Sequence, residues 1–361
     1  MKNLFTFIFL ITSLAVVGQD RFTDSIKTKY NIVGLSYAVF KSDTILEIGA
    51  LGKRRVDNDA LIKLSDRFHI GSNGKAITAL LAAKIVEQKK INWDTKFFDL
   101  FPELKVTSKQ AYWNMTLKDL LCHRAHIPAY RSVNANNEVY KIEGTSVEQK
   151  IKFAAKILSE EPVENDSGHV YAYSNAGISL AASMLEKVTR KSWEQLIEEY
   201  INKQLKLNFE FGFPNVTDVN QPWGHILNAD TIMPLPPDFD YHLATVMRPT
   251  GDLNVSIENY LKLIQLFLKG YKGEDNFIKS ESYKYLLTAM PDYSFGWANK
   301  IIGGKQYNYH SGSGGTFGCF TKIDRDNDIA AIVMVNYVDG GALDAIPLIA
   351  NSLLKKYSAK K

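Results

Sequence analysis

The chain has 361 residues and a formal net charge of +4 at pH 7. Apolar residues make up 45% of it and charged residues 23%, which is ordinary for a water-soluble globular protein. The small net charge and the lack of a long basic run in the sequence argue against a nucleic-acid partner. The length suits one large domain or two intergrown lobes.

The N-terminus has the layout of a secretory signal. Lys2 precedes an apolar stretch at residues 4–17, and small residues follow it. A membrane anchor is the alternative, but the stretch is shorter than the roughly 20 residues that a spanning helix needs. We therefore expect a signal peptide at residues 1–18 and a mature chain from about Gln19. The protein would then be periplasmic or secreted in a bacterium, with no stable membrane span.

Only two cysteines are present, Cys122 and Cys319. An exported protein can form disulfides, so the two could pair. Sequence does not show whether their Cα atoms come close enough for a bond. Two buried, unpaired thiols are the expectation.

Strand-like segments lie at both ends of the chain and bracket a mostly helical middle. Residues 33–52 alternate and are rich in β-formers, as in two antiparallel strands joined near residues 41–43. Glycines and charged turns separate further expected strands at 294–302, 306–312, 315–324 and 328–337. Helical periodicity begins near Ser72 and recurs at 146–158, 178–201, 257–268 and 342–356. Two long loops, 123–145 and 208–250, are expected to line a site.

This order predicts an α+β fold with one antiparallel sheet built from both chain ends. The last helix would pack on the sheet, and a mostly helical lobe would be inserted between its halves. Residues 19–361 then form a single domain, with a sheet lobe at about 19–75 and 285–361 and a helical lobe at about 76–284. A cleft between the lobes is the expected position of the functional site.

Ser72 and Lys75 lie three residues apart at the start of a long apolar helix. Residues i and i+3 share a helical face, so the lysine amine can reach the serine hydroxyl. Free N–H groups and the positive dipole end favour an oxyanion there and lower the pKa of a lysine. The pair is a candidate nucleophile and base. The plain alternative is a serine that caps the helix beside a solvated lysine, and the same spacing also occurs at Ser352 and Ser358.

Tyr173 and Asn175 form a second candidate motif, in HVYAYSNAGISL. In an extended segment residues i and i+2 point the same way, so a phenol and an amide would face one cleft. A phenol can relay a proton and an amide can hold a peptide group. The alternative is an aromatic core residue followed by a helix cap, and residues 112–114 match the same pattern.

His310 begins a third motif with Ser311 and Gly312, in YHSGSGGTFGCF. Glycine lets a backbone approach a ligand closely. A strand edge with free N–H groups can supply an oxyanion donor and pair with an extended substrate. The histidine could donate a hydrogen bond to the substrate or to the tyrosine. The alternative is a hairpin whose glycines serve only its turn.

The three motifs occur in one order, in contexts that suit one cleft. With their flanking segments they make the chain similar to the serine hydrolases related to penicillin-binding proteins and class C β-lactamases. That group includes D-alanyl-D-alanine carboxypeptidases, D-aminopeptidases and esterases, and the resemblance covers nearly all of the mature chain. Its segments include FHIGSNGKAITALLAAKIVEQ, MTLKDLLCHRAHIP, YSNAGISLAASMLEKV and YHSGSGGTFGCF. In the second, Ala125 and His126 replace what is commonly a Ser-Gly pair.

The resemblance implies a β-lactamase/transpeptidase-like fold and acyl transfer through a covalent intermediate. Ser72 would attack the carbonyl carbon. Lys75 would take the serine proton or share it in a network. Tyr173 would act as base and then as acid toward the leaving group. Which of the two takes the proton during acylation stays open.

The remaining roles that the resemblance implies concern substrate binding. Asn175 would bind the substrate amide, and His310 would take the role of the third motif with Ser311 and Gly312. The backbone N–H groups of Ser72 and Ser313 would form the oxyanion hole. No metal or cofactor is expected, because the other histidines lack a metal-ligand spacing and are interpreted as loop or packing residues: His123, His126, His225 and His242.

The third motif departs from the Lys-Thr-Gly form. A histidine with a pKa near 6.5 is mostly neutral at pH 7, which weakens the case for an efficient β-lactamase. Lys300, Arg248 and Arg124 are candidates for a substitute cation. We expect an exported serine hydrolase of a small peptide or ester, with a D-amino-acid peptide of cell-wall type as the leading substrate. A β-lactamase and a non-catalytic penicillin-binding-like sensor are the alternatives.

Overall fold

A computed structural model of the chain describes residues 20–131, 138–163, 171–239 and 242–358. The expected signal peptide at residues 1–18 lies outside these ranges. None of the helices within them is both long enough and apolar enough to cross a bilayer.

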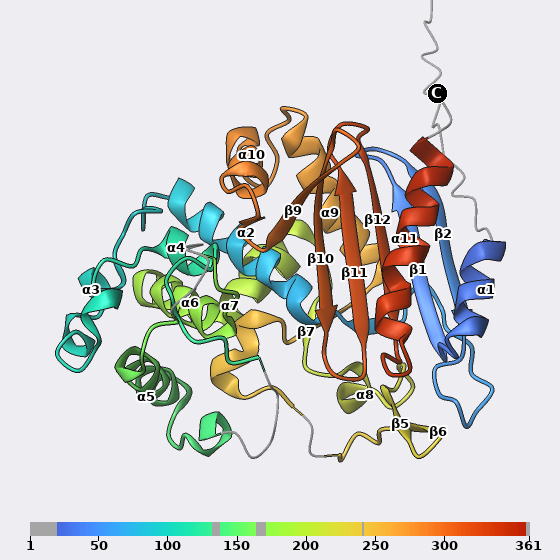
Figure 1. Cartoon of the computed structure of the whole chain (residues 1–361), viewed down its shortest axis with the longest axis horizontal. Coiled ribbons are helices and arrows are strands. Elements are labelled where there is room, and N and C mark those ends of the chain that lie inside the picture. The colour runs from blue at the N-terminus through green and yellow to red at the C-terminus, as the bar shows by residue number, and fades with distance from the viewer. Residues whose placement is uncertain (1–19, 132–137, 164–170, 240–241, 359–361) are drawn as a thin grey trace, which may run out of the picture.

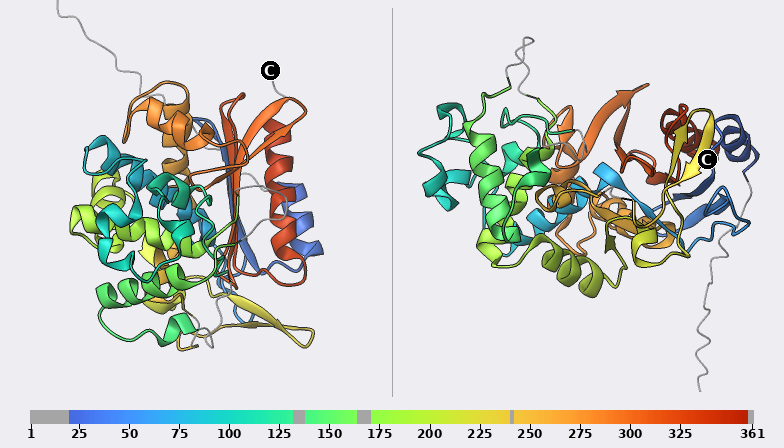
Figure 2. Two further views of the ribbon diagram at one scale, coloured as in Figure 1. Left: turned by 60° about the vertical axis from the view of Figure 1, so that its left-hand side comes forward. Right: turned by 90° about the horizontal axis from the view of Figure 1, so that it is seen from below.

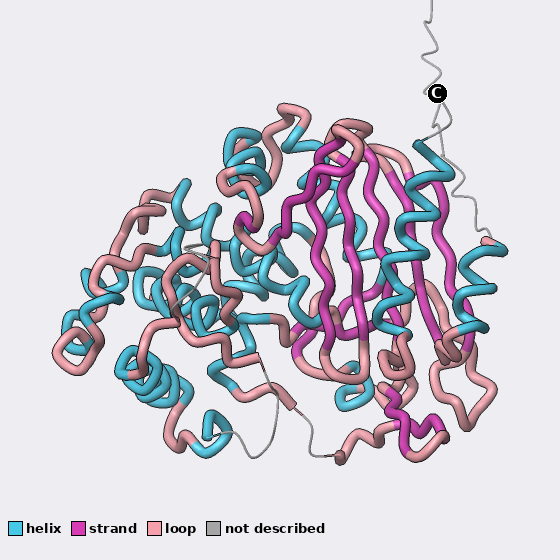
Figure 3. The backbone as a smooth tube through the Cα atoms, in the orientation of Figure 1, coloured by secondary structure: helices cyan, strands magenta, loops and turns pink. Residues whose placement is uncertain are grey.

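A seven-stranded antiparallel sheet is built from both ends of the chain, which confirms the predicted fold class (Figure 1, Figure 3). The N-terminal strands are β1 (Gly34–Phe40) and β2 (Ile45–Gly52), and β1 pairs with β12 so that Leu35 lies opposite Val335. The strand order is β2-β1-β12-β11-β10-β9-β8. The C-terminal strands are β8 (Tyr293–Ser294), β9 (Trp297–Ile302), β10 (Lys305–Ser313), β11 (Gly318–Asp324) and β12 (Ile329–Val335).

Both faces of the central strands are buried, because helices cover the sheet on each side. Helices α1 (Arg21–Lys29) and α11 (Ala342–Ser358) pack on one face, as the left view of Figure 2 shows. Helix α9 (Ile257–Tyr271) packs on the other face, against β1 and β12. The period-two alternation of β1 sends Tyr37 and Val39 toward α11, and Ala38 and Phe40 toward the core that includes α9.

The remaining helices gather beside the sheet, on the left in Figure 1. Helix α2 (Gly74–Glu87) lies nearest the sheet, is almost wholly buried and packs on α6 and α10. These helices are α3 (Phe97–Leu100), α4 (Leu117–Leu121), α5 (Ser146–Ser159), α6 (Asn175–Thr189), α7 (Trp193–Leu196) and α10 (Ser280–Thr288). Short 3₁₀ turns join them at η1 (Gly71–Asn73), η2 (Pro102–Leu104), η3 (Gln110–Tyr112), η4 (Glu138–Lys141) and η6 (Thr245–Thr250).

The single helix expected at 178–201 is wrong. Helix α6 ends at Thr189 because Arg190 adopts a left-handed conformation, with φ of 56°. Ser192 then caps a new helix through a capping box with Gln195. Helix α7 follows, and a π-helical stretch, Ile197–Gln204, continues it.

The expected loop at 208–250 contains more regular structure than the sequence predicts. Strand β4 (Glu210–Phe211) joins β3 (Arg67–His69) and β7 (Leu253–Ser256) in a small sheet. A hairpin of β5 (His225–Asn228) and β6 (Thr231–Pro234) and the short α8 (Pro214–Thr217) occupy much of the rest. These elements are too short to show a clear periodicity.

Both cysteines are buried and free, as expected. Cys122 follows α4, whereas Cys319 lies on β11. Burial raises the pKa of Cys122 to about 12 and also raises that of Cys319. Neither thiol is therefore suited to act as a nucleophile.

Candidate active site

Ser72 lies where the start of α2 meets strand β10. Two glycines allow this approach: a Cβ on Gly71, whose φ is 50°, would lie 2.5 Å from Ser313 N, and one on Gly312 would lie 2.8 Å from Ser72 N. No side chain caps η1 or α2. The interpretation of Ser72 as a plain helix cap is therefore wrong. Asn73 instead anchors the turn, by donating hydrogen bonds to Ile70 O and Cys319 O.

Lys75 is fully buried beneath Ser72. Its Nζ lies 2.9 Å from Ser72 Oγ and donates to the backbone carbonyl of Thr250, also at 2.9 Å. No carboxylate pairs with it among the described residues. Desolvation holds the pKa of Lys75 well below its ordinary value, and the charge of Arg131 lowers it further. A neutral amine beside a serine hydroxyl can accept its proton.

Tyr173 lies over the same amine, with Lys75 Nζ 5.0 Å from its ring centroid. Burial raises the pKa of Tyr173 above its ordinary value, and the neighbouring side chain of Ser72 offsets this shift only in part. The resting phenol therefore carries its proton, which suits a donor. Of the two candidate bases, the electrostatics favour Lys75 for acylation.

Ser174 and Asn175 connect Tyr173 to helix α6. Ser174 is the N-cap, because its Oγ accepts a hydrogen bond from Gly177 N at 2.9 Å. Asn175 donates from Nδ2 to Tyr130 O at 3.0 Å, while its Oδ1 is buried and has no hydrogen-bond partner within the described ranges. That oxygen is available to accept an N–H from a substrate. The predicted role in amide binding stays a prediction.

His310 lies near the predicted tyrosine but does not hydrogen-bond to it. The rings of His310 and Tyr173 are 6.3 Å apart. His310 Nε2 instead pairs with the hydroxyl of Tyr293 at 3.0 Å, and Nδ1 pairs with Ser311 O at 2.9 Å. Burial lowers the pKa of His310 to about 3, and Lys75 contributes to that shift. This histidine is therefore neutral and brings no charge to the site.

The end of β10 presents an open strand edge beside Ser72. Pairing between β10 and β9 stops at Tyr309 opposite Ala298. On its other side the strand stays paired with β11 through Ser313. Ser311 and Ser313 are exposed, whereas Gly312 is buried against η1. An extended substrate could pair along this edge, with its carbonyl oxygen between the backbone N–H groups of Ser72 and Ser313.

Two residues at the site were not identified from the sequence. His123, expected to be a packing residue, lies against Tyr173 with ring centroids 4.4 Å apart. The guanidinium of Arg131 lies 5.1 Å from the centroid of the Tyr173 ring, and the residue is exposed. Neither residue forms part of a recognisable spacing, so only the folded loop brings it to the tyrosine.

The three cations expected near the third motif are engaged elsewhere or exposed. Arg124 pairs with Asp292. Arg248 lies 3.5 Å from Glu194 and 3.4 Å from Asp252. Lys300 is exposed on β9, opposite Tyr307 of β10. Arg131 is thus a better candidate for a cation that faces a bound substrate.

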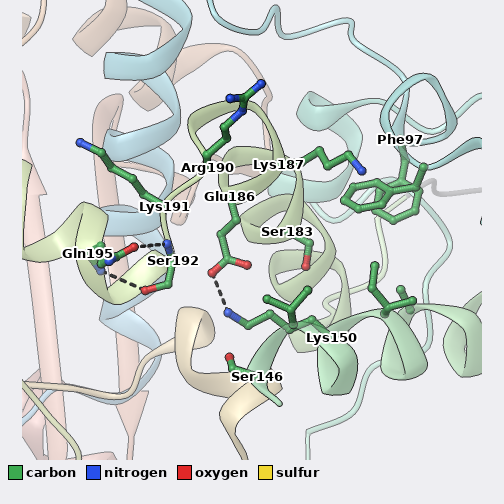
Figure 4. A pocket seen from close by; sticks show the side chains of 14 residues that line it. Phe97, Ser146, Lys150, Ser183, Glu186, Lys187, Arg190, Lys191, Ser192 and Gln195 are labelled. Carbon is green, nitrogen blue, oxygen red and sulfur yellow. Dashed lines mark hydrogen bonds and ion pairs between the residues drawn. The ribbon is translucent and has the colours of Figure 1, made fainter. Parts of the chain in front are cut away.

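A cavity of about 450 Å³ lies apart from this site, between α5, α6 and α7 (Figure 4). Its lining is mostly apolar and includes Phe97 and Phe101. Two pairs of polar groups on its wall bind each other: Lys150 Nζ lies 2.6 Å from Glu186 Oε1, and Ser192 N donates to Gln195 Oε1. No titratable group at the Ser72 site lines this cavity.

Comparisons with known proteins agree with this geometry. Residues 19–353 match the family described as Beta-lactamase. Protein flp of Staphylococcus aureus is 22% identical over 317 residues, which cover 85% of this chain and 60% of that protein. The chain therefore spans about 60% of the length of that curated relative.

Two solved structures have a similar fold. The octameric penicillin-binding protein homologue from Pyrococcus abyssi aligns with a TM-score of 0.75 and 22% identity, covering 94% of this chain and 77% of that one. A class C β-lactamase from Rhodobacter sphaeroides aligns with a TM-score of 0.72 and 16% identity, covering 92% and 97%. At these identities the likeness shows the fold.

Proposed function

Because the chain belongs to the Beta-lactamase family, we propose that it is a serine hydrolase that cleaves an amide or ester through an acyl-enzyme on Ser72. The leading substrate class is a D-amino-acid peptide of cell-wall type, or a related ester. A β-lactamase and a non-catalytic sensor are the alternatives. Residues 1–18 support export to the periplasm or the medium as part of the same proposal.

The observation that carries the proposal is the pair of Lys75 and Ser72. A buried lysine without a carboxylate is costly, so a fold retains one where its chemistry is needed. Here the amine lies 2.9 Å from a serine hydroxyl. Tyr173 and the open edge of β10 face the same hydroxyl. A sensor that never reacted would not need the lysine neutral.

The geometry supports a sequence of proton transfers that returns Ser72, Lys75 and Tyr173 to their starting protonation states. Ser72 Oγ forms a bond to the substrate carbonyl carbon, while its proton passes to Lys75 Nζ. The bond to the leaving group then breaks, as the leaving nitrogen or oxygen takes the proton of Tyr173. Tyr173 recovers a proton from Lys75. Water next attacks the acyl carbon and gives one proton to Lys75 Nζ. The bond between the acyl carbon and Ser72 Oγ then breaks, Oγ takes that proton back, and the acid is released.

Arg131 supports a substrate that carries a negative charge. Its guanidinium is exposed above the Tyr173 ring, and no carboxylate pairs with it among the described residues. His310 is neutral, so the third motif supplies no competing charge. A substrate carboxylate near the leaving group could pair with the guanidinium of Arg131. A peptide with a free C-terminus has that charge.

The test is the intact mass of the protein after brief exposure to a penicillin and, separately, to a fluorophosphonate. We expect the parent to gain one equivalent of reagent and Ser72→Ala to gain none. Ser352→Ala is the matched control, because Ser352 has the same Ser-x-x-Lys spacing but lies on α11, across the sheet. It should label like the parent.

The two reagents separate the substrate classes. A stable penicillin adduct indicates a carboxypeptidase-like site that deacylates slowly. Labelling by the fluorophosphonate alone indicates the esterase or aminopeptidase branch, and consumption of penicillin without an adduct indicates a β-lactamase. Labelling that survives Ser72→Ala, or an absence of labelling by both reagents, would overturn the proposal.

A further inference from the structure

His123 holds the segment on both sides of Tyr173. It follows α4 and is buried, with 2% of its surface exposed. Its backbone carbonyl accepts a hydrogen bond from Ala172 N at 2.8 Å. Its ring Nδ1 accepts one from Ser174 N at 3.2 Å. One residue thus binds the peptide groups before and after the tyrosine.

The imidazole ring also packs directly on the tyrosine. The His123 and Tyr173 ring centroids are 4.4 Å apart, and the His123 and Tyr293 centroids are 4.6 Å apart. Tyr293 in turn pairs through its hydroxyl with His310. His123 therefore packs both on the tyrosine of the second motif and on Tyr293, the residue that pairs with the histidine of the third motif.

The position is costly for the fold, which indicates a function. His123 has a left-handed backbone, with φ of 58°, as is common for the residue after a helix C-cap. Since Nδ1 accepts a hydrogen bond, the ring proton lies on Nε2. That Nε2 is buried without a hydrogen-bond partner in the described ranges. An apolar side chain would avoid this cost, but it could not accept from Ser174 N.

We propose that His123 is a positioning residue, which holds the phenol of Tyr173 in line to protonate the leaving group. The inference rests on the proposed function, because it assigns a purpose to the placement of Tyr173. His123 itself touches neither Ser72 nor Lys75 by hydrogen bond. It acts through the tyrosine.

A defect in leaving-group protonation can be told apart from a loss of folded protein by comparing the hydrolysis rates of two esters. Phenyl acetate releases a basic phenolate that needs a proton, whereas p-nitrophenyl acetate releases a stable anion that needs none. Loss of proton donation should therefore slow the first ester more than the second. A general loss of folded protein would slow both equally.

The experiment compares His123→Phe with His123→Asn on these two esters. Phenylalanine keeps a ring but loses the acceptor for Ser174 N. Asparagine places its Oδ1 where the imidazole has Nδ1 and tolerates a positive φ. We expect His123→Phe to lower kcat for phenyl acetate about 30-fold, less than the roughly 10²–10⁴-fold that a general acid contributes in full, because the phenol is displaced and not removed. For p-nitrophenyl acetate the loss should stay under about 3-fold, with KM little changed. His123→Asn should retain most of the phenyl acetate rate.

Tyr173→Phe provides the reference pattern. It should show the same selective loss, at least as large. The double variant with His123→Phe should be no slower than Tyr173→Phe alone, because the histidine acts through the phenol. Additive losses would overturn the inference, as would equal losses on the two esters or a His123→Asn as slow as His123→Phe.

His126→Phe is the matched control. His126 also has a left-handed backbone, with φ of 55°, and lies three residues away in the same loop. Its Nδ1 pairs with Val163 O, not with the tyrosine segment. The control should leave the ratio of the two ester rates unchanged. If His123→Phe fails to fold, His123→Gln replaces it, since its amide lies one bond too far out to accept from Ser174 N.

Failure of this inference can be told apart from failure of the proposed function. Parent turnover of p-nitrophenyl acetate must disappear in Ser72→Ala. Turnover that persists there would overturn the proposed nucleophile, and this inference with it. Turnover that depends on Ser72, together with an unselective His123→Phe, overturns the positioning role alone.

Discussion

Among the described residues, two lysines are buried in helices, and their surroundings differ. Lys75 is 0% exposed and Lys150 is 9% exposed. Lys150 has a carboxylate, with Nζ 2.6 Å from Glu186 Oε1. Lys75 has only a serine hydroxyl and a backbone carbonyl. A carboxylate stabilises the ammonium form, whereas burial without one favours the neutral amine.

The two sites differ in which form of a buried lysine they stabilise. At α5 and α6 a cation serves as a structural link between two helices, as Figure 4 shows for Lys150 and Glu186. At the start of α2 an ammonium would be useless as a base. The absence of a carboxylate beside Lys75 within the described ranges is therefore as informative as the presence of Ser72.

The largest expected effect comes from removing the amine that lacks a carboxylate. Lys75→Met should lower kcat/KM about 10³-fold, as expected for loss of a general base. The free energy of unfolding should not fall, because an apolar side chain of similar length replaces a desolvated amine. Steady-state kinetics and thermal denaturation check the two parts. A variant that kept its activity would remove Lys75 from the mechanism.

The free energy of unfolding should also depend on pH in a way that reports whether Lys75 is neutral in the folded protein. The pKa of Lys75 is lowered in the folded protein. At any pH between that lowered pKa and the ordinary lysine pKa, the unfolded chain therefore binds more protons than the folded one. Stability of the parent then rises with pH across this window. Lys75→Met lacks the effect. Its advantage over the parent should be larger at pH 7 than at pH 10, as measured by denaturant unfolding.

The opposite result is expected for the paired lysine. Lys150→Met leaves the carboxylate of Glu186 buried without its cation, which should lower the free energy of unfolding by about 3 kcal/mol. Activity should stay within about 2-fold of the parent, because the pair lies apart from the reacting groups. Denaturant unfolding at pH 7 measures the first effect and ester hydrolysis the second. Adding Glu186→Leu should restore part of the stability.

The smallest expected effect concerns Arg131, whose charge helps to keep Lys75 neutral. Arg131→Gln should raise the pKa of Lys75. Since the neutral amine is the active form, the acidic limb of kcat/KM against pH should move to higher pH, by less than about one unit. His310, with a pKa of about 3, does not titrate in that range.

Arg190→Gln is the control for that shift. It removes the same charge from the far end of α6, about 22 Å along the helix from Asn175. The pH profile of this variant should match that of the parent. A profile for Arg131→Gln that did not move would show that the guanidinium does not act on the amine.

Much of the fold could be predicted from the sequence, because its strands and longer helices have a strong period. The pairing of both chain ends in one sheet followed from strand-like segments at 33–52 and after 293. The break at Arg190 could not be predicted, since no glycine marks it and the apolar spacing continues past it. The short strands of 208–250 were missed because each depends on a distant partner.

Some residues of the candidate site could be predicted from the sequence, and others could not. Ser72, Lys75 and Tyr173 could be predicted as one group because fixed spacings and their order in the chain mark them. The structure places their side chains together. His123 and Arg131 lie 50 and 42 residues from Tyr173 in sequence, so only the tertiary path of their loop reveals them. The partner of His310 is Tyr293, which no motif included.

The pairing of β1 with β12 has a consequence for a chain that is still being synthesised. Leu35 meets its partner Val335 only after 300 further residues have been made. Until then β1 and β2 form at most an isolated hairpin, which is marginal in water, and Ser313 cannot reach the start of α2. The groups that surround Ser72 thus come together only after β10 and β12 have been synthesised. A nascent chain carries Ser72 without the surroundings that would make it reactive, and folding of so non-local a sheet is expected to be slow.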